Sequence, residues 1–209
     1  MSDGRIAVLD YGIGNLGSAY KALVHLGAQA ELVTSPEQAR GAAGVVLPGV
    51  GAFGRCVTSL RRAGFDDVVA DALAAETPLL AICVGLQMLY EGSEEDPAVP
   101  GLGVLPGMVR ALPGSVKRPQ MQWNRLEPTT SSSRLVEALG EHRWVYFVHS
   151  YAAEASPDVV ATCDYGGPVV AAVERGSLWG TQFHPEKSGQ SGLALLAGFV
   201  AACQYRPAR

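Results

Sequence analysis

The N-terminal half of the chain alternates short apolar runs with glycine-rich turns and stretches of helical spacing. The apolar runs are residues 5–10, 30–33, 44–48 and 78–83. Residues 16–26 carry apolar side chains at helical spacing, and Gly27 is suited to close that helix. Continuous apolar strands that alternate with helices predict a parallel sheet covered on both faces, and ligands of such doubly wound sheets bind at the carboxyl ends of the strands.

From about Gly101 onward, apolar runs follow one another with short turns between them. These runs are residues 104–112, 121–126, 144–151, 159–165, 169–175 and 178–184. The last two, joined by Gly176 and Ser177, predict a β-hairpin, and residues 191–202 have the apolar stripe of a closing helix. No repeat or linker divides the chain. We therefore expect one domain over residues 1–209, a three-layer, flavodoxin-like, mostly parallel α/β sheet with additional antiparallel strands in its C-terminal half.

Composition narrows the class of protein. Hydrophobic residues make up 48% and charged residues 17%, which excludes a disordered chain, and a net charge of −4 argues against nucleic-acid binding. The apolar runs are shorter than the roughly 18 residues of a membrane span, and residues 1–5 lack the apolar region of a signal peptide. The cysteines form no CxxC pair, which fits a reducing compartment. We expect a cytoplasmic protein without membrane or nucleic-acid partners.

Cys83 ends the apolar run 78–83 and begins a helical stretch. Ala81 and Gly85, small residues two positions before and after it, permit the sharp strand-to-helix turn of a nucleophile elbow. A thiol at the N-terminus of a helix gains from the helix dipole and from free N–H groups, which favour the thiolate. The alternative is a buried structural cysteine, and this pentapeptide alone leaves both hypotheses open.

His184 and Glu186 flank Pro185 at the end of another apolar run. Side chains two apart in an extended segment share a face, and proline stiffens the arrangement. A carboxylate beside an imidazole can hold its tautomer and support the imidazolium, which is the orienting role in a catalytic triad. A surface turn is the alternative. A zinc site is the weaker hypothesis, because no second His or Cys stands at ligand spacing.

Gly49, Val50 and Gly51 directly follow the apolar run 44–48. Glycines allow unusual backbone conformations and expose N–H groups, as an oxyanion hole requires. A plain strand-to-helix turn and a phosphate-binding loop are the alternatives, but the segment lacks the Lys-Ser/Thr of a P-loop. Residues 11–15 are a weak phosphate-loop candidate for the same reason.

Several motifs occur together and in order between about Ile6 and Phe199. They are residues 48–51, 83–87, 120–124, 146–151 and 184–189. In this combination the chain resembles the class I glutamine amidotransferases. It is most similar to the glutaminase subunits of imidazole glycerol phosphate synthases of histidine biosynthesis, because Gly-Val-Gly after Pro48, Trp123-Asn124 and residues 186–189 are typical of them.

The resemblance implies a division of catalytic labour. Cys83 would attack the side-chain amide of L-glutamine to form a glutamyl thioester. His184 would activate the thiol and then protonate the departing ammonia, while Glu186 orients His184. Backbone N–H groups of Val84 and of the Gly49-Val50-Gly51 strand (residues 49–51) would hold the oxyanion. In the family, that strand adopts an unproductive orientation until the synthase subunit is engaged.

The resemblance also implies binding and partner residues. The glutamine would be held by Gln87 and Glu95, with backbone contacts from Ser150 and Tyr151. The partner would be a (β/α)₈-barrel cyclase that forms a heterodimer with this chain and receives the ammonia. Its products would be imidazole glycerol phosphate and an aminoimidazole carboxamide ribotide. No metal or organic cofactor is implied.

Three positions of the chain are implied to lie at the cyclase interface, where ammonia leaves without meeting bulk water. They are Asn15, Trp123 and Lys187.

Two departures from the family pattern stand out. Gln120 and Gln122 replace a histidine and a glycine before Trp123. Gln120 can still form hydrogen bonds much as histidine would, whereas Gln122 must find room for a side chain. Ala81 stands where glycine is usual in the elbow. Two other functions stay open, a glutaminase subunit of a different synthase and a catalytically silent interaction subunit. The synthase that co-purifies with the chain tests the first of these, and labelling of Cys83 by a glutamine-analogue electrophile tests the second.

Overall fold

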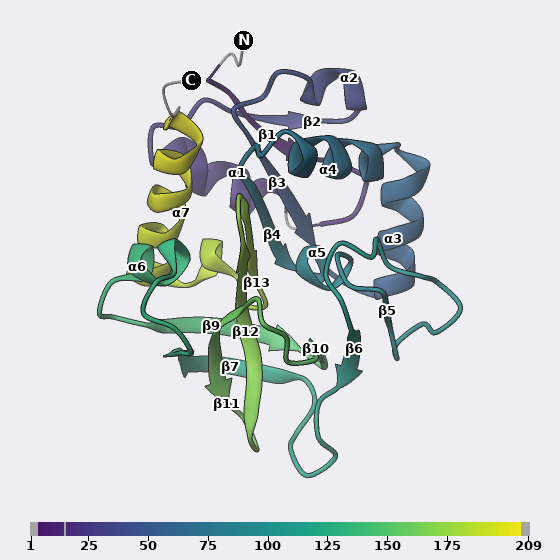
Figure 1. Cartoon of the computed structure of the whole chain (residues 1–209), viewed down its shortest axis with the longest axis vertical. Coiled ribbons are helices and arrows are strands. Elements are labelled where there is room, and N and C mark those ends of the chain that lie inside the picture. The colour runs from purple at the N-terminus through teal and green to yellow at the C-terminus, as the bar shows by residue number, and fades with distance from the viewer. Residues whose placement is uncertain (1–3, 15, 206–209) are drawn as a thin grey trace.

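A large mixed sheet forms the centre of the molecule. The computed structural model describes residues 4–14 and 16–205, and within these ranges the sheet has eight strands in the order β2-β1-β3-β4-β13-β12-β11-β8 (Figure 1). The strands are Ile6–Leu9 (β1), Ala30–Val33 (β2), Gly44–Gly49 (β3), Leu79–Cys83 (β4), Glu127–Pro128 (β8), Val159–Asp164 (β11), Pro168–Arg175 (β12) and Leu178–Thr181 (β13).

The direction of the strands changes along the sheet. β1 pairs in parallel with β2 and β3, β4 joins β3 in parallel, and β13 adds to β4 in parallel. Beyond β13, the strands β12, β11 and β8 are antiparallel to their neighbours. The expected doubly wound, mostly parallel sheet with antiparallel strands in the C-terminal half is confirmed, and so is the hairpin of β12 and β13.

Helices cover both faces of the parallel part, which explains why its strands are apolar throughout (Figure 1). One layer holds α1 (Leu16–His25) and α7 (Gly189–Gln204), with α6 (Arg134–Leu139) packed on α7. The other layer holds α3 (Phe53–Arg62) and α4 (Phe65–Ala74), with α2 (Pro36–Ala39) packed on α4.

Two smaller sheets complete the structure. One has the order β10-β6-β5 and comprises Tyr151–Ala153, Met108–Ala111 and Gly92–Ser93. The other is an antiparallel ribbon of β7 (Gln120–Arg125) and β9 (Trp144–His149), named the β7–β9 ribbon below. In Figure 1 the ribbon runs across the strands of the central sheet, below the point where β4 leads into α5 (Val84–Gln87).

Three of the sequence-based boundaries are wrong. The strand expected over residues 104–112 is only β6, because Gly107 turns the chain with a φ of +97° just before Met108. The strand expected over 144–151 divides into β9 and β10 at Ser150, and the one over 178–184 ends at Thr181, before the 3₁₀ turn Pro185–Lys187. Helix α6 was not expected, and Ser133 caps it by accepting a hydrogen bond from the Val136 N–H.

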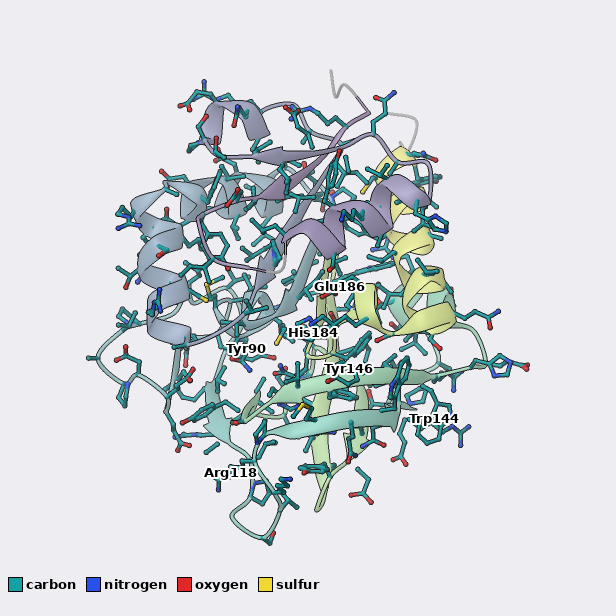
Figure 2. All side chains as sticks on the ribbon, turned by 180° about the vertical axis from the view of Figure 1, so that it is seen from behind. Tyr90, Arg118, Trp144, Tyr146, His184 and Glu186 are labelled. Carbon is teal, nitrogen blue, oxygen red and sulfur yellow. The ribbon has the colours of Figure 1, made fainter. Side chains whose placement is uncertain are left out.

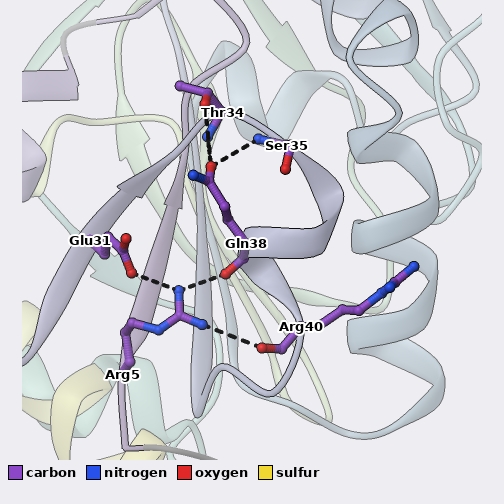
Figure 3. A network of polar contacts seen from close by, with 6 residues as sticks. All are labelled: Arg5, Glu31, Thr34, Ser35, Gln38 and Arg40. Atoms are coloured by element: carbon purple, nitrogen blue, oxygen red, sulfur yellow. Dashed lines mark hydrogen bonds and ion pairs between the residues drawn. The ribbon is translucent and has the colours of Figure 1, made fainter.

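Arg5 joins three elements at one edge of the central sheet (Figure 3). Its guanidinium lies 2.9 Å from the Glu31 carboxylate of β2 and donates to the carbonyls of Gln38 and Arg40, at 2.6 and 3.3 Å. The Gln38 side-chain oxygen in turn accepts the Thr34 N–H at 2.7 Å. Since the last carbonyls of a helix lack intrahelical partners, Arg5 both satisfies them and holds α2 against β1.

Among the residues described, no helix has the length and apolar character needed to cross a membrane.

Candidate active site

Cys83 sits on a sharply bent backbone at the junction of β4 and α5. Its φ of 55° and ψ of −114° lie where side chains rarely occur, and only 3% of the residue is exposed. A Cβ on Gly85 would stand 2.1 Å from the Leu47 carbonyl oxygen, and one on Gly49 would stand 2.4 Å from the Gly85 nitrogen. The elbow therefore requires glycine at both positions. Ala81 is fully buried within β4.

His184 and Glu186 face each other in a buried pair. His184 Nδ1 lies 2.8 Å from Glu186 Oε1, and the two side chains are 2% and 3% exposed. Ser188 holds the turn by donating its hydroxyl to the His184 carbonyl oxygen at 2.6 Å. Figure 2 shows the pair between the β7–β9 ribbon and the α/β body. The carboxylate selects the tautomer with the proton on Nδ1, which leaves Nε2 for a reacting group.

Cys83 is the group that His184 meets. Burial lowers the pKa of His184, but hydrogen bonding to Cys83 and to Glu186 outweighs burial and raises that pKa to about 9. A thiol and a carboxylate on either side of one imidazole form the arrangement that activates a cysteine nucleophile. The structure thus brings together residues that are about a hundred positions apart in the sequence.

A cavity of about 460 Å³ opens beside this set. Its volume falls within the range of small-molecule sites. The sequence-predicted residues that line it are Val50, Gly51, Cys83, Val84, Gln87, Glu95, Ser150, Tyr151, His184 and Lys187. Gly49 lies behind the wall, paired with Cys83 across β3 and β4, and Glu186 lies behind His184.

Glu95 and Gln87 are held differently at the cavity. Glu95 Oε2 accepts the Phe53 N–H at 2.8 Å, so its carboxylate is anchored at the first turn of α3. The Gln87 amide nitrogen donates to the Tyr151 carbonyl oxygen at 2.8 Å and to Gln182 Oε1 at 3.0 Å. Both hydrogens of the Gln87 amide are therefore engaged within the protein.

Tyr11 and Cys56 hold the end of β3 and the loop that follows it. No sequence pattern indicated this role for either residue. The Tyr11 hydroxyl donates to the Pro48 carbonyl oxygen at 2.6 Å, and Cys56 Sγ donates to the Val50 carbonyl oxygen at 3.3 Å. Burial raises the pKa of Cys56 to about 11 and that of Tyr11 well above its usual range. Both groups therefore stay protonated donors at neutral pH.

His149 is a neutral imidazole in the wall of the cavity. Its Nδ1 lies 2.8 Å from the Tyr151 carbonyl oxygen, which can only accept, so Nδ1 carries the proton. Burial lowers the pKa of His149 to about 4, and the neighbouring His184 acts in the same direction. His149 belongs to the motif at residues 146–151, and it lines the cavity together with Ser150 and Tyr151.

Of the described residues expected at the partner interface, Lys187 is exposed and lines the cavity, whereas Trp123 does not line it. Trp123 of β7 is 48% exposed and packs edge-on against Tyr146 of β9, with ring centroids 6.1 Å apart. Gln122 is exposed on the same ribbon. Asn15 lies outside the described residues. Within the described ranges, no cluster of three or more His, Cys, Asp or Glu side chains could hold a metal ion.

Comparisons with known proteins identify the family of the chain. The family model "Glutamine amidotransferase class-I" matches residues 7–203. A relative from Synechococcus sp. (strain JA-3-3Ab), named imidazole glycerol phosphate synthase subunit HisH, is 48% identical over 202 residues, covering 94% of this chain and 93% of its own length. The HisH subunit of Acinetobacter baylyi is 44% identical over 200 residues, covering 94% and 97%.

Solved structures agree on the fold. A crystal structure of a glutamine amidotransferase superposes with a TM-score of 0.75 at 22% identity, covering 96% of this chain and 99% of that one. The structure of PurLQS from Thermotoga maritima gives a TM-score of 0.76 at 21% identity, with the same coverage. Because the family match and the HisH relatives both span nearly the whole chain, the chain belongs to the class I glutamine amidotransferases and, among them, to the HisH subunits of imidazole glycerol phosphate synthase.

Proposed function

We propose that this chain hydrolyses L-glutamine through Cys83, His184 and Glu186 and passes the ammonia to a (β/α)₈-barrel cyclase subunit. The observation that carries the proposal is the bent Cys83 elbow meeting a buried imidazole–carboxylate pair at one 460 Å³ cavity. The elbow and the pair come from segments about a hundred positions apart in the sequence. A buried structural cysteine would need neither the unfavourable φ nor the charged pair.

The chemistry follows from these positions. His184 Nε2 takes up the proton of the Cys83 thiol before substrate reacts, which leaves a thiolate beside an imidazolium. Cys83 Sγ then attacks the carbon of the glutamine carboxamide. The oxyanion binds backbone N–H groups of Val84, at the start of α5, and of the Gly49-Val50-Gly51 loop (residues 49–51). As the C–N bond breaks, His184 donates its proton to the departing nitrogen, which leaves as ammonia. Water then attacks the thioester with His184 as the base, which releases glutamate and restores the thiol.

The glutamine backbone is held away from the reacting end. The anchored Glu95 carboxylate offers the ammonium group of the substrate an opposite charge within the cavity wall. Ser150 and Tyr151 contribute backbone groups from the turn between β9 and β10, and Gln87 shapes the floor. Glu95 and the backbone of Ser150 and Tyr151 would hold the amino-acid end of the substrate, and Cys83 is 3% exposed. This arrangement fits an amino acid whose side-chain amide reaches the buried sulfur.

The partner proposal rests on the relatives and on the β7–β9 ribbon. The relatives are named as subunits of imidazole glycerol phosphate synthase, and the ribbon exposes Met121 and Trp123 at 62% and 48%. We place the cyclase against Trp123, Lys187 and Asn15, in a heterodimer that makes imidazole glycerol phosphate and aminoimidazole carboxamide ribotide. All the cysteines are free and buried, which supports a cytoplasmic site of action.

Glutamate release tests the proposal. We expect the purified chain mixed with its barrel cyclase to release glutamate from L-glutamine, with a large increase when the nucleotide substrate of the cyclase is added. Cys83→Ala should abolish this release and leave cyclisation intact when ammonium salt is supplied. If folded wild-type complex releases no glutamate under any condition, the proposal is wrong. If the chain co-purifies with another synthase, a different amidotransferase role replaces this one.

A further inference from the structure

Two buried side-chain amides, those of Gln87 and Gln182, form a line of hydrogen bonds that ends at the sulfur of Cys83. Gln182 Nε2 lies 3.7 Å from Cys83 Sγ, and Gln182 Oε1 accepts a hydrogen bond from Gln87 Nε2 at 3.0 Å. The same Gln87 nitrogen donates to the Tyr151 carbonyl oxygen at 2.8 Å. Gln182 and Gln87 are 1% and 3% exposed, so water does not compete for these bonds.

The Tyr151 carbonyl oxygen, at the end away from Cys83, determines which group donates in each hydrogen bond of the line. The carbonyl of Tyr151 can only accept, so Gln87 must turn its NH₂ group toward that oxygen. The second hydrogen of that NH₂ group binds Gln182 Oε1. With its oxygen on Gln87, the Gln182 amide presents its NH₂ group on the other side, where the sulfur lies. Cys83 therefore faces an N–H donor and not a carbonyl oxygen.

Neighbouring contacts hold both ends of the line in place. His149 Nδ1 donates to the same Tyr151 carbonyl oxygen at 2.8 Å, which restrains the acceptor. The Gln182 backbone N–H donates to the Ala171 carbonyl oxygen at 2.9 Å, so Gln182 extends the ladder of β12 and β13. A donor at the end of a strand, tied to the neighbouring strand by a backbone hydrogen bond, keeps its position more closely than one carried by a free loop.

We propose that Gln182 stabilises the thiolate of Cys83 by donating a hydrogen bond to the sulfur, and that Gln87 sets the orientation of the donor. A hydrogen bond to an ionised acceptor favours the charged form, and a dry surrounding strengthens it. The inference rests on the proposed function of Cys83 as a nucleophile. In this proposal Gln87 lines the cavity and also determines which end of the Gln182 amide faces the sulfur.

Alkylation of Cys83 tests the inference without the partner. In the full-length chain, the rate of reaction with iodoacetamide is followed against pH, and the Cys83 peptide is quantified by mass spectrometry to separate it from Cys56, Cys163 and Cys203. Gln182→Met keeps the length of the side chain and removes the donor. In Gln182→Met we expect the pH of half-maximal rate to rise by about one unit relative to the wild type. At pH values below this midpoint, the variant should react roughly tenfold more slowly than the wild type. Gln87→Met frees the Gln182 amide to rotate and should give a smaller rise.

Thr181→Val is the matched control. Thr181 is fully buried beside Gln182, its hydroxyl has no partner among the described residues, and its side chain points to the opposite face of the strand. Its alkylation profile should equal that of the wild type. An unchanged profile in folded Gln182→Met would overturn the inference, and if that variant does not fold, an unchanged profile in Gln87→Met would do so.

The two proposals fail in different ways. Glutamate release by the wild-type complex together with unchanged alkylation profiles leaves the glutaminase function standing and removes the role of Gln182. Shifted profiles in a chain that never releases glutamate leave the hydrogen bond to the sulfur standing and remove the glutaminase function.

Discussion

At the scale of single residues, two histidines of the same pocket have opposite protonation. The pKa of His184 is lowered by burial but raised overall to about 9 by Cys83 and Glu186, whereas burial lowers the pKa of His149 to about 4. The difference comes from the partners, since His149 meets a neutral carbonyl and His184 meets a thiol and a carboxylate. At neutral pH one imidazole is charged beside the nucleophile and the other is a neutral donor behind it.

The buried neutral state of His149 predicts a pH dependence of stability. Between pH 6.5 and about 4, the unfolded chain takes up a proton on His149 that the folded chain does not, so the free energy of unfolding falls as the pH falls through this window. The change amounts to about 3 kcal/mol. His184 adds no slope there, because its raised pKa leaves it protonated in both states below pH 6.5 and its contribution is lost only as the pH rises toward about 9.

His149→Asn isolates this group. The asparagine amide can keep the hydrogen bond to the Tyr151 carbonyl oxygen but does not titrate. Urea denaturation at several pH values between about 4.5 and 6.5 should show a clearly flatter dependence in the variant than in the wild type. Equal slopes in the two chains would mean that His149 is protonated alike in the folded and unfolded states.

At the scale of elements, the active site depends on how closely β3, β4 and α5 approach one another. α5 begins directly after Cys83, and its first turn packs against the backbone of β3 at Leu47 and Pro48. Only a residue without a Cβ allows this approach. The same contact fixes the N-terminus of α5 directly after Cys83.

Gly85→Ala should therefore be strongly destabilising. Its Cβ would stand 2.1 Å from the Leu47 carbonyl oxygen, which is backbone and cannot move aside without shifting β3. We expect a loss of about 3 kcal/mol or more in the free energy of unfolding. Thermal or urea denaturation measures it.

Gly17→Ala serves as the control for the elbow variant. Gly17 lies in α1 with open space around its Cβ position, so alanine should stabilise the protein by about 0.5–1 kcal/mol. A Gly85→Ala chain as stable as the wild type would show that β3 and α5 can separate without cost.

At the scale of the whole molecule, the β7–β9 ribbon has two unlike faces. One face is buried against the body and includes Gln120, Val145, Phe147 and His149. The other face exposes Met121, Trp123 and Trp144, and Figure 2 shows Trp144 near one end of the ribbon. The buried face reaches the cavity through His149 and the exposed face is the one that we assign to the cyclase, so the ribbon connects the proposed interface to the site.

Trp123→Ala should weaken binding to the cyclase. Exposed tryptophans at the centre of an interface commonly contribute more than 1 kcal/mol, so we expect the dissociation constant to rise about tenfold or more. Calorimetric titration of the cyclase into the chain measures it. Tyr205→Ala is the control, since Tyr205 is 75% exposed just beyond α7, away from the ribbon. The same affinity in the Trp123 variant and the wild type would place the partner elsewhere.

The sequence by itself determined the parallel sheet, the hairpin of β12 and β13, the elbow at Cys83 and the pairing of His184 with Glu186. Each of these depends on neighbours within a few positions, because strand periodicity, turn glycines and side chains two apart are local properties. The boundaries of β6 and β9 were misjudged where a glycine or a bend interrupts an apolar run, since apolar character alone does not reveal a turn. The roles within the site remain predictions that glutamate release and alkylation will test.

Only the tertiary structure decided which distant side chains complete the site. Gln182 meets Cys83 across 99 positions of sequence, and Tyr11 meets Pro48 across 37. Neither contact can be predicted from the residues around Gln182 or Tyr11, because a hydrogen bond between distant segments leaves no periodic pattern in either one. The burial of His149 is likewise a property of the packed ribbon and not of its strand. Local sequence specifies the helices and strands, and the packing of these elements brings the Gln182 amide within reach of the Cys83 sulfur.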